Sequence, residues 1–360
     1  MSNPRRYFVC GNTAQGFVNY FSSNLKNLDR VYILKGGPGT GKSTMRKKIG
    51  EYFMAKDMDI DYIYCSSDPT SLDGVIIKDL STAIVDGTAP HIIEPTAPGA
   101  IEEYINLGIC WDRERLTKHK RDILRIQEDI SSMFRRLYGL LRDAKVYHSD
   151  LEKIYIKNTD FSKIDEICEN LIGEVFDGVK NRDREPVFVH RFFGALTADG
   201  SVNHIENLTE NINCRYFIKG RPGTGKSTLL KKLASTANLL GLDVEVYHCA
   251  LDSDSIDMVI IPELTTCFFD ATPPHELFPS RDGDVIIDIY ETAVSPDAEH
   301  NNISQICEIK SEYNQIINQA STLITEIRKA HDDLESYYIN AVDYSITDTI
   351  TQEIIEHIKK

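Results

Sequence analysis

Two copies of one glycine-rich sequence constrain the fold of this chain more than any other feature. The first copy is GGPGTGKST at 36–44 and the second is GRPGTGKST at 220–228, in a chain of 360 residues. Both fit GxxxxGK[ST], in which glycines let the backbone curl so that its N–H groups point inward at an anion such as phosphate. An apolar run precedes each copy and a helix-forming segment follows it, which is the context that such a loop requires.

The similarity extends far beyond the two loops and indicates an internal duplication. Residues that match at the same offset as the loops include Cys65/Cys249, Asp68/Asp252, Asp73/Asp257, Asp86/Asp270, Thr88/Thr272 and His91/His275. Further along, HSDLEKIYI at 148–156 matches HDDLESYYI at 331–339. We therefore predict two tandem repeats, the first over 1–185 and the second over 186–360.

Within each repeat, short apolar runs alternate with a helical pattern. The runs VYILKG, DIDYIYC and TAIVDG predict strands in the first repeat, and YFIKG, DVEVYHC and TCFFDA predict the same strands in the second. This alternation favours an α/β fold with parallel sheets wrapped by helices. The segments 100–108 and 284–292 occupy equivalent places but differ in periodicity, so they stay unassigned.

Each repeat ends in a long helical segment. Apolar residues recur with a period of about 3.5 from Leu116 to Leu151 and from Ile306 to Leu334, which predicts helices of roughly 40 residues and 60 Å. A shorter helix follows each of them. We therefore expect each repeat to carry a helical hairpin, here called its arm, at about 113–176 and about 301–359.

The two arms differ in charge. Residues 113–145 contain ten Lys or Arg and five Asp or Glu, whereas residues 299–335 contain three and seven. Two solvated helix faces would explain this pattern, and so would pairing of the arms with each other, within or between chains, or with a protein partner. Contact of the basic arm with nucleic acid is the least favoured interpretation, because the formal net charge of the chain is −15.

Composition indicates whether the chain associates with a membrane and in which cellular compartment it works. No apolar run approaches the roughly 20 residues that span a bilayer, so no membrane association is expected. The eight cysteines are scattered singly, without a CxxC pair. This usage favours a reducing compartment over a disulfide framework or a zinc site, and we expect a cytoplasmic protein.

The two glycine loops are the predicted nucleotide-binding sites. Lys42 and Lys226 would reach the β- and γ-phosphates, and the hydroxyls of Ser43 and Ser227 would hold Mg²⁺. The candidate nucleotide-binding residues are the members of the two loops: Gly36, Gly37, Pro38, Gly39, Thr40, Gly41, Lys42, Ser43, Thr44, Gly220, Arg221, Pro222, Gly223, Thr224, Gly225, Lys226, Ser227 and Thr228.

A carboxylate is needed to complete the magnesium shell. Asp86 and Asp270 each end an apolar strand downstream of the loop, and we predict that they hold the metal together with Ser43 and Ser227. A turn aspartate that closes a strand is the alternative. No glutamate follows either aspartate, so a common water-activating carboxylate is missing from that position and slow hydrolysis is expected.

Other paired residues are candidates for proton transfer. His91 and His275 end the motifs DGTAPH and DATPPH, where they could sense the γ-phosphate or carry a proton, or be structural. Asp68 and Asp252 follow the second predicted strand, where they could accept a proton from a bound hydroxyl or orient water. Asp73 and Asp257 are second candidates, and loop capping is the alternative for all four aspartates.

The motifs together resemble those of known proteins. GGPGTGKST and GRPGTGKST are similar to the Walker A loops of the P-loop NTPase superfamily, especially those of AAA-type ATPases. The series GNTAQGF, GGPGTGKST, SLDGVII, DGTAPH and GRPGTGKST resembles bacterial proteins with tandem Walker A loops that are described as ATPases of unknown function. The resemblance covers nearly the whole chain and implies two P-loop NTPase-like repeats that bind ATP, but it implies no substrate.

Three functions remain open on the sequence. The first is a Mg·ATP-binding ATPase that couples nucleotide state to the geometry of its arms. The second is a kinase for a small molecule or nucleotide, with Asp68 or Asp252 as the base. The third is a nucleotide-bound scaffold that does not hydrolyse and whose arms recruit partners.

Overall fold

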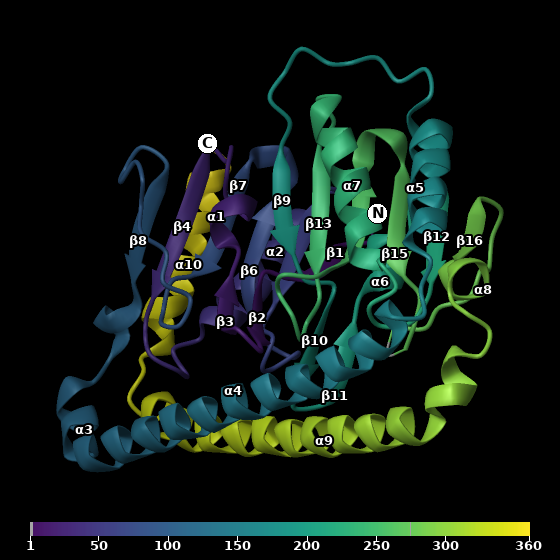
Figure 1. Cartoon of the computed structure of the whole chain (residues 1–360). Coiled ribbons are helices and arrows are strands. Elements are labelled where there is room, and N and C mark those ends of the chain that lie inside the picture. Colours follow the sequence, from purple (N-terminus) through teal and green to yellow (C-terminus); the bar gives the residue numbers. More distant parts are fainter. Residues whose placement is uncertain (1–2, 274) are drawn as a thin grey trace.

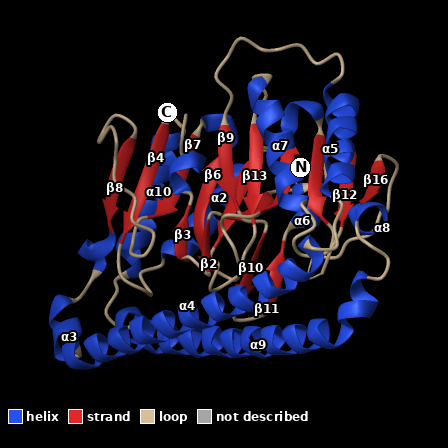
Figure 2. Ribbon diagram, viewed as in Figure 1, coloured by secondary structure: helices blue, strands red, loops and turns tan. Residues whose placement is uncertain are grey.

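The chain folds into two α/β halves that lie side by side above a pair of long helices (Figure 1, Figure 2). A computed structural model describes residues 3–273 and 275–360, so Pro274 of the motif DATPPH lies outside the described residues. The loop 177–187, which contains no helix or strand, joins the last helix of the first repeat to the first strand of the second. The expected α/β class with two sheet-containing halves is confirmed.

Each half contains one six-stranded sheet, and the two sheets share one strand order. The first sheet runs in the order β1 (Arg5–Phe8), β5 (Ile60–Tyr64), β6 (Leu72–Ile77), β7 (Thr82–Asp86), β4 (Arg30–Lys35) and β8 (Glu102–Asn106). The second runs in the order β9 (Phe188–Arg191), β13 (Val244–His248), β14 (Ile256–Ile261), β15 (Thr266–Asp270), β12 (Cys214–Lys219) and β16 (Asp284–Asp288).

The prediction of parallel sheets is wrong in one respect, because both sheets are mixed. Strands β6 and β14 run antiparallel to both of their neighbours. The sequence predicted no strand at either place, yet every residue of both strands is buried. The unassigned segments form β8 and β16, edge strands that pair in parallel with the strands leading into the glycine loops.

The two halves meet around an approximate two-fold axis. Phe8 and Phe192, which are equivalent residues of the repeats, pair with each other through two backbone hydrogen bonds of 2.9 and 2.8 Å. Alternate residues of β4 divide between two cores: Val31 and Ile33 face a core shared by both halves, whereas Tyr32 and Leu34 face the helices of the first half. The shared core joins the halves into one body.

Smaller elements complete the shared region. The antiparallel hairpins β2 (Cys10–Thr13) with β3 (Gly16–Asn19) and β10 (Gly194–Thr197) with β11 (Gly200–Asn203) reach toward the long helices (Figure 1). Short helices α1 (Phe21–Asn24) and α6 (Ile205–Leu208) follow them.

The two arms pair with each other, which confirms one of the alternatives drawn from their sequence. Helix α4 (Lys120–Ile156), preceded by α3 (Arg113–Lys118), lies along α9 (Ala298–Ile339) beneath both halves (Figure 1). The contact is apolar, with Leu137 and Leu141 packed against Ala320 and Leu323. Among the described residues no ion pair links α4 to α9, so the apolar seam rather than charge difference holds the helices together.

The expected hairpins do not form, because the short helices cross to the opposite half. Helix α5 (Phe161–Phe176) of the first repeat packs on α7 (Lys226–Leu239) of the second. Helix α10 (Tyr344–Ile358) of the second repeat packs on α2 (Lys42–Met54) of the first. The two repeats therefore exchange their last helices within one chain. No helix in the described part of the chain is long and apolar enough to cross a membrane.

Candidate functional site

Each glycine loop joins the strand next to the sheet edge to a helix, in the strand–loop–helix order that the sequence predicted. In the first half the loop leaves β4, and α2 begins at Lys42 directly after Gly41. Gly39 and Gly41 have φ values of 67° and 82°, which side chains rarely adopt, and this conformation curls the backbone. Thr40 is buried and its Oγ1 donates to Gly37 O at 2.8 Å, which closes the loop on itself. The second loop repeats this arrangement, with φ of 79° and 86° at Gly223 and Gly225.

The predicted metal-binding aspartates lie beside the loop lysines. Asp86 ends β7 and pairs in register with Leu34 of the parallel strand β4, just before the first loop. Its Oδ2 lies 3.8 Å from Lys42 Nζ, and in the second half Asp270 Oδ2 lies 3.4 Å from Lys226 Nζ. The structure therefore brings each loop lysine and its predicted aspartate together.

The loop serines are held by the strand that the sequence analysis missed. Ser43 Oγ accepts a hydrogen bond of 3.0 Å from Leu72 N at the start of β6, and Ser227 Oγ accepts one of 3.0 Å from Ile256 N of β14. Each hydroxyl keeps a second lone pair and its own proton. In the second half, Ser227 and Asp270 beside Lys226 are a donor set that suits Mg²⁺, which usually keeps several waters. Among the described residues no cluster of three or more His, Cys, Asp or Glu offers a protein-only metal site.

Charge in the first site is set by a residue that the sequence analysis did not single out. Arg46 Nη2 lies 3.5 Å from Asp86 Oδ2. Burial alone would raise the pKa of Asp86, but Arg46 and Lys42 outweigh it and hold the pKa below its ordinary value. Burial lowers the pKa of Lys42, and the neighbouring Arg46 adds to that effect.

The paired histidines each face a buried aspartate of β6 or β14. His91 Nε2 lies 3.6 Å from Asp73 Oδ2, and His275 Nε2 lies 3.9 Å from Asp257 Oδ2. Burial raises the pKa of Asp73, and burial together with neighbouring Asp270 raises the pKa of Asp257 to about 7. These aspartates were predicted only as second candidates, although their presence in both copies was a signal that each histidine had a partner.

Asp68 and Asp252 contact the arms of the opposite repeat. Lys145 Nζ of α4 lies 2.5 Å from Asp252 Oδ2, and Gln15 Nε2 donates to the other oxygen at 2.6 Å. Arg328 Nη2 of α9, the repeat equivalent of Lys145, lies 3.8 Å from Asp68 Oδ1. Burial would raise the pKa of Asp252, but Lys145 and Gln15 lower it overall. A carboxylate with a lowered pKa is a weaker base, so this arrangement does not favour proton abstraction by Asp252.

The ends of the long helices rest on the glycine loops, and the sequence analysis missed this contact. Glu335 Oε1 of α9 accepts a hydrogen bond of 3.2 Å from Gly39 N, and Tyr344 at the start of α10 donates to Gly39 O at 2.8 Å. In the second half the backbone of Glu152 on α4 lies so close to Gly223 that an added Cβ would meet its carbonyl oxygen at 2.7 Å. The matched segments 148–156 and 331–339 were the signal for this contact.

Arg221 makes the second loop chemically different from the first. Its Nε donates to Glu299 Oε1 at 2.6 Å, and its guanidinium lies over the ring of Tyr290, 4.7 Å from the centroid. Tyr155 of α4, from the first repeat, donates to the same Glu299 oxygen at 2.9 Å, so Arg221 lies where the two repeats meet beside the loop.

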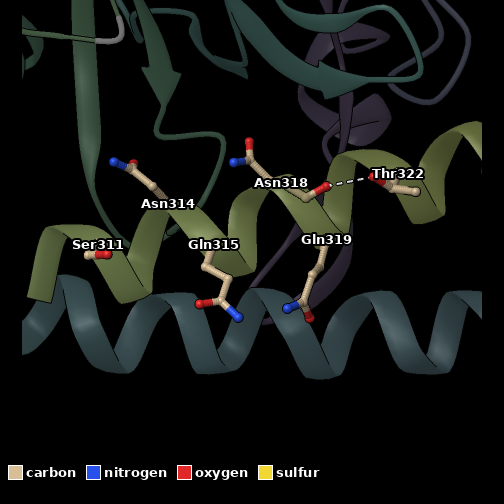
Figure 3. Close-up of a pocket in the computed structure, with 6 residues that line it drawn as sticks. All are labelled: Ser311, Asn314, Gln315, Asn318, Gln319 and Thr322. Carbon is tan, nitrogen blue, oxygen red and sulfur yellow. Dashed lines mark hydrogen bonds between the residues drawn. The ribbon is translucent and has the colours of Figure 1, made fainter.

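A depression on the surface of α9 lies apart from both loops. Figure 3 shows that its lining side chains all come from this one helix, and Thr322 donates to Asn318 O at 2.9 Å. The lining residues are Ser311, Asn314, Gln315, Asn318, Gln319 and Thr322. Because no second element contributes to this surface, it does not enclose a ligand, and the glycine loops remain the candidate site.

Comparison of the chain with protein-family models, with curated proteins and with solved structures gave no match.

Proposed function

We propose that this chain is a Mg·ATP-binding protein that hydrolyses ATP slowly and couples nucleotide state to the position of its long helices. The observation that carries the proposal is the contact of each glycine loop with the end of the other repeat's long helix. Glu335 Oε1 accepts from Gly39 N, a backbone donor of the kind that binds phosphate oxygens in such loops. A nucleotide phosphate at the first loop would therefore compete with a carboxylate of α9, and its arrival or loss would move that helix.

Binding of phosphate, binding of metal and retention of a proton can each be assigned to particular residues. Lys42 and Lys226 neutralise phosphate charge, and Ser227 with Asp270 would hold Mg²⁺, which supplies charge neutralisation at the transferring phosphate when bound. Burial and the neighbouring Asp270 raise the pKa of Asp257 to about 7, so this carboxyl group is suited to hold a proton beside Asp270, and His275 Nε2 lies 3.9 Å from it. The kinase alternative is less well supported, because Asp68 and Asp252 are paired with cations of the arms.

Replacing each loop lysine separately tests the proposal. We expect Lys42→Ala and Lys226→Ala each to remove one of two bound ATP molecules per chain, because each lysine contributes charge to one phosphate site. We expect the double variant to release phosphate at least about 10²-fold more slowly than the wild-type protein. Equilibrium dialysis with ATP and a phosphate-release assay without any acceptor measure the two effects.

Lys329→Ala provides the matched control, because Lys329 is an exposed lysine of α9 away from the loops. It should bind and hydrolyse ATP like the wild-type protein. Unchanged ATP binding and turnover in the double variant would contradict the proposal. ADP formed only with an added acceptor, and without free phosphate, would favour the kinase instead, whereas binding without either product would favour the scaffold.

The competition at Gly39 gives a second test. Glu335→Ala should tighten ATP binding at the first loop about tenfold, since a charge-assisted hydrogen bond and a nearby negative charge no longer oppose the phosphate. Glu152→Ala is the control, because the Glu152 side chain faces Lys145 and His148 and only its backbone is against Gly223. Titration of both variants in the Lys226→Ala background isolates the first loop. Weaker binding by Glu335→Ala would mean that this carboxylate supports the site.

A further inference from the structure

The two nucleotide sites differ at one buried position of the helix that follows the loop. Position 46 of α2 is Arg, whereas the equivalent position of α7 is Leu230, although the residues around both are nearly identical. The Arg46 side chain is only 3% exposed. Leu230 is fully buried and packs in the apolar core of the second half.

Arg46 is fixed toward Asp86 by its own hydrogen bonding. Its Nη2 donates to Leu72 O and also lies 3.5 Å from Asp86 Oδ2. The other carboxylate oxygen, Oδ1, accepts from Thr88 N at 2.8 Å. Both oxygens of the predicted metal ligand are therefore engaged by donors that the fold holds in place.

The second site lacks this fixed cation. Asp270 Oδ1 accepts from Thr272, as Asp86 does from Thr88, but Oδ2 has Lys226 at 3.4 Å as its ion-pair partner among the described residues. When Lys226 turns to a bound phosphate, Asp270 is left without a fixed cation. When Lys42 does the same, Asp86 keeps Arg46.

We infer that the two sites differ in their need for metal: the first binds nucleotide without Mg²⁺, with Arg46 in place of the metal, whereas the second requires Mg²⁺. This inference rests on the proposed function and deepens it. A divalent cation beside the buried Arg46 guanidinium would be repelled, and Arg46 already neutralises the negative charge of Asp86 that would attract it. The predicted metal site at Ser43 and Asp86 therefore does not fit Mg²⁺, whereas the one at Ser227 and Asp270 does.

Two further donor nitrogens of Arg46 are available to a ligand. Its Nε and Nη1 are buried and have no acceptor among the described residues. Buried donors are almost always paired in folded proteins, so these two indicate an acceptor that arrives with a ligand or water. Each of these two N–H groups could donate singly to a phosphate oxygen, since Nη2, the nitrogen that either would need for a bidentate contact, is already engaged. Phosphoryl transfer assisted by Mg²⁺ is then possible only beside Asp270. The second half therefore hydrolyses ATP, whereas the first half keeps its nucleotide bound.

Counting bound ATP with and without divalent metal tests the inference. We expect the wild-type protein to bind two ATP per chain in Mg²⁺ and one in EDTA by equilibrium dialysis. Lys42→Ala should lose the ATP that survives EDTA, and Lys226→Ala should lose the ATP that depends on Mg²⁺. Arg46→Leu, which installs the residue of the second half, should lower EDTA-resistant binding by at least tenfold while two ATP still bind in Mg²⁺.

The possible results distinguish failure of this inference from failure of the proposed function. Two ATP that are both lost in EDTA, or EDTA-resistant ATP that disappears in Lys226→Ala rather than Lys42→Ala, would overturn the inference and leave ATP binding intact. No ATP bound in either condition would overturn the proposed function together with the inference. The lysine variants decide the question even if Arg46→Leu does not fold, because Lys42 and Lys226 are only partly buried.

Discussion

Replacing Ile354 with alanine is expected to destabilise the first half of the molecule, although Ile354 belongs to the second repeat. Ile354 of α10 is 3% exposed and packs with Met45, Ile49 and Phe53 of α2. Truncation of a buried isoleucine to alanine costs about 2–5 kcal/mol, from lost burial and from the cavity left behind. Amide hydrogen exchange should therefore quicken in α2 and remain unchanged in α7.

The chain offers a matched reciprocal variant for this prediction. Leu171 of α5 is the repeat equivalent of Ile354, and it is also 3% exposed, but it packs with α7 of the second half. Leu171→Ala should therefore quicken exchange in α7 and leave α2 protected. Glu353→Ala, on the exposed side of α10, should change the free energy of unfolding by no more than about 0.5 kcal/mol. If each alanine variant instead loosened the half that carries its own repeat, the exchange of helices would be disproved.

The fold features that followed from the sequence are those that depend on local patterns. The doubled loop, the strand before it, the helix after it and the aspartate at the end of the neighbouring strand all follow from short-range spacing, and the structure places them together. The apolar seam of the arms was also predictable, since a period of 3.5 residues identifies the contact face of a long helix whatever its partner is.

The exchange of α5 and α10 could not be read from the sequence, because duplication makes the two possible partners equivalent. The groove beside α2 and the groove beside α7 are built from corresponding residues, so α5 could pack on either one. What decides between them is the length and direction of α4 and α9, which carry each short helix to the far half. Only the three-dimensional path of the chain contains that information.

Two parts of the candidate site were missed for different physical reasons. Strand β6 begins in a polar loop, and burial of all its residues depends on α2, which packs on one face of the sheet, and on the shared core at the other face. Arg46 lies in a helix with lysines at positions 47 and 48, where an arginine is typical of a solvated face. Its burial beside Asp86 depends on how α2 packs against the sheet, which the helical pattern alone does not specify.

Replacing Glu245 with glutamine is expected to lower the free energy of unfolding by about 3–5 kcal/mol, because the change removes the nearest counter-charge of Arg5 and Arg191 and leaves Arg191 with only Asp61 of the described carboxylates, at 3.9 Å. Glu245 lies on β13 of the second half, and its carboxylate binds Arg5 of β1 in the first half at 2.8 and 2.5 Å. It also lies 3.0 Å from Arg191 of β9, and the side chains of Arg191 and Glu245 are only 8% and 10% exposed. Glu185→Gln is the control, since its partner Lys26 and Glu185 itself are exposed and such pairs contribute little.

The same network predicts how this loss of stability depends on pH. Burial would raise the pKa of Glu245, but Arg5 and Arg191 outweigh it and hold the pKa well below its ordinary value of 4.5. A carboxyl group whose pKa is lower in the folded state stabilises the fold above the unfolded-state pKa, and this contribution is lost as the pH falls toward the folded-state value. Denaturant unfolding of the wild-type protein and Glu245→Gln should therefore show the full difference at pH 7 and a smaller one at pH 3. A difference that stayed constant between these pH values would mean that the charge of Glu245 does not hold the two halves together.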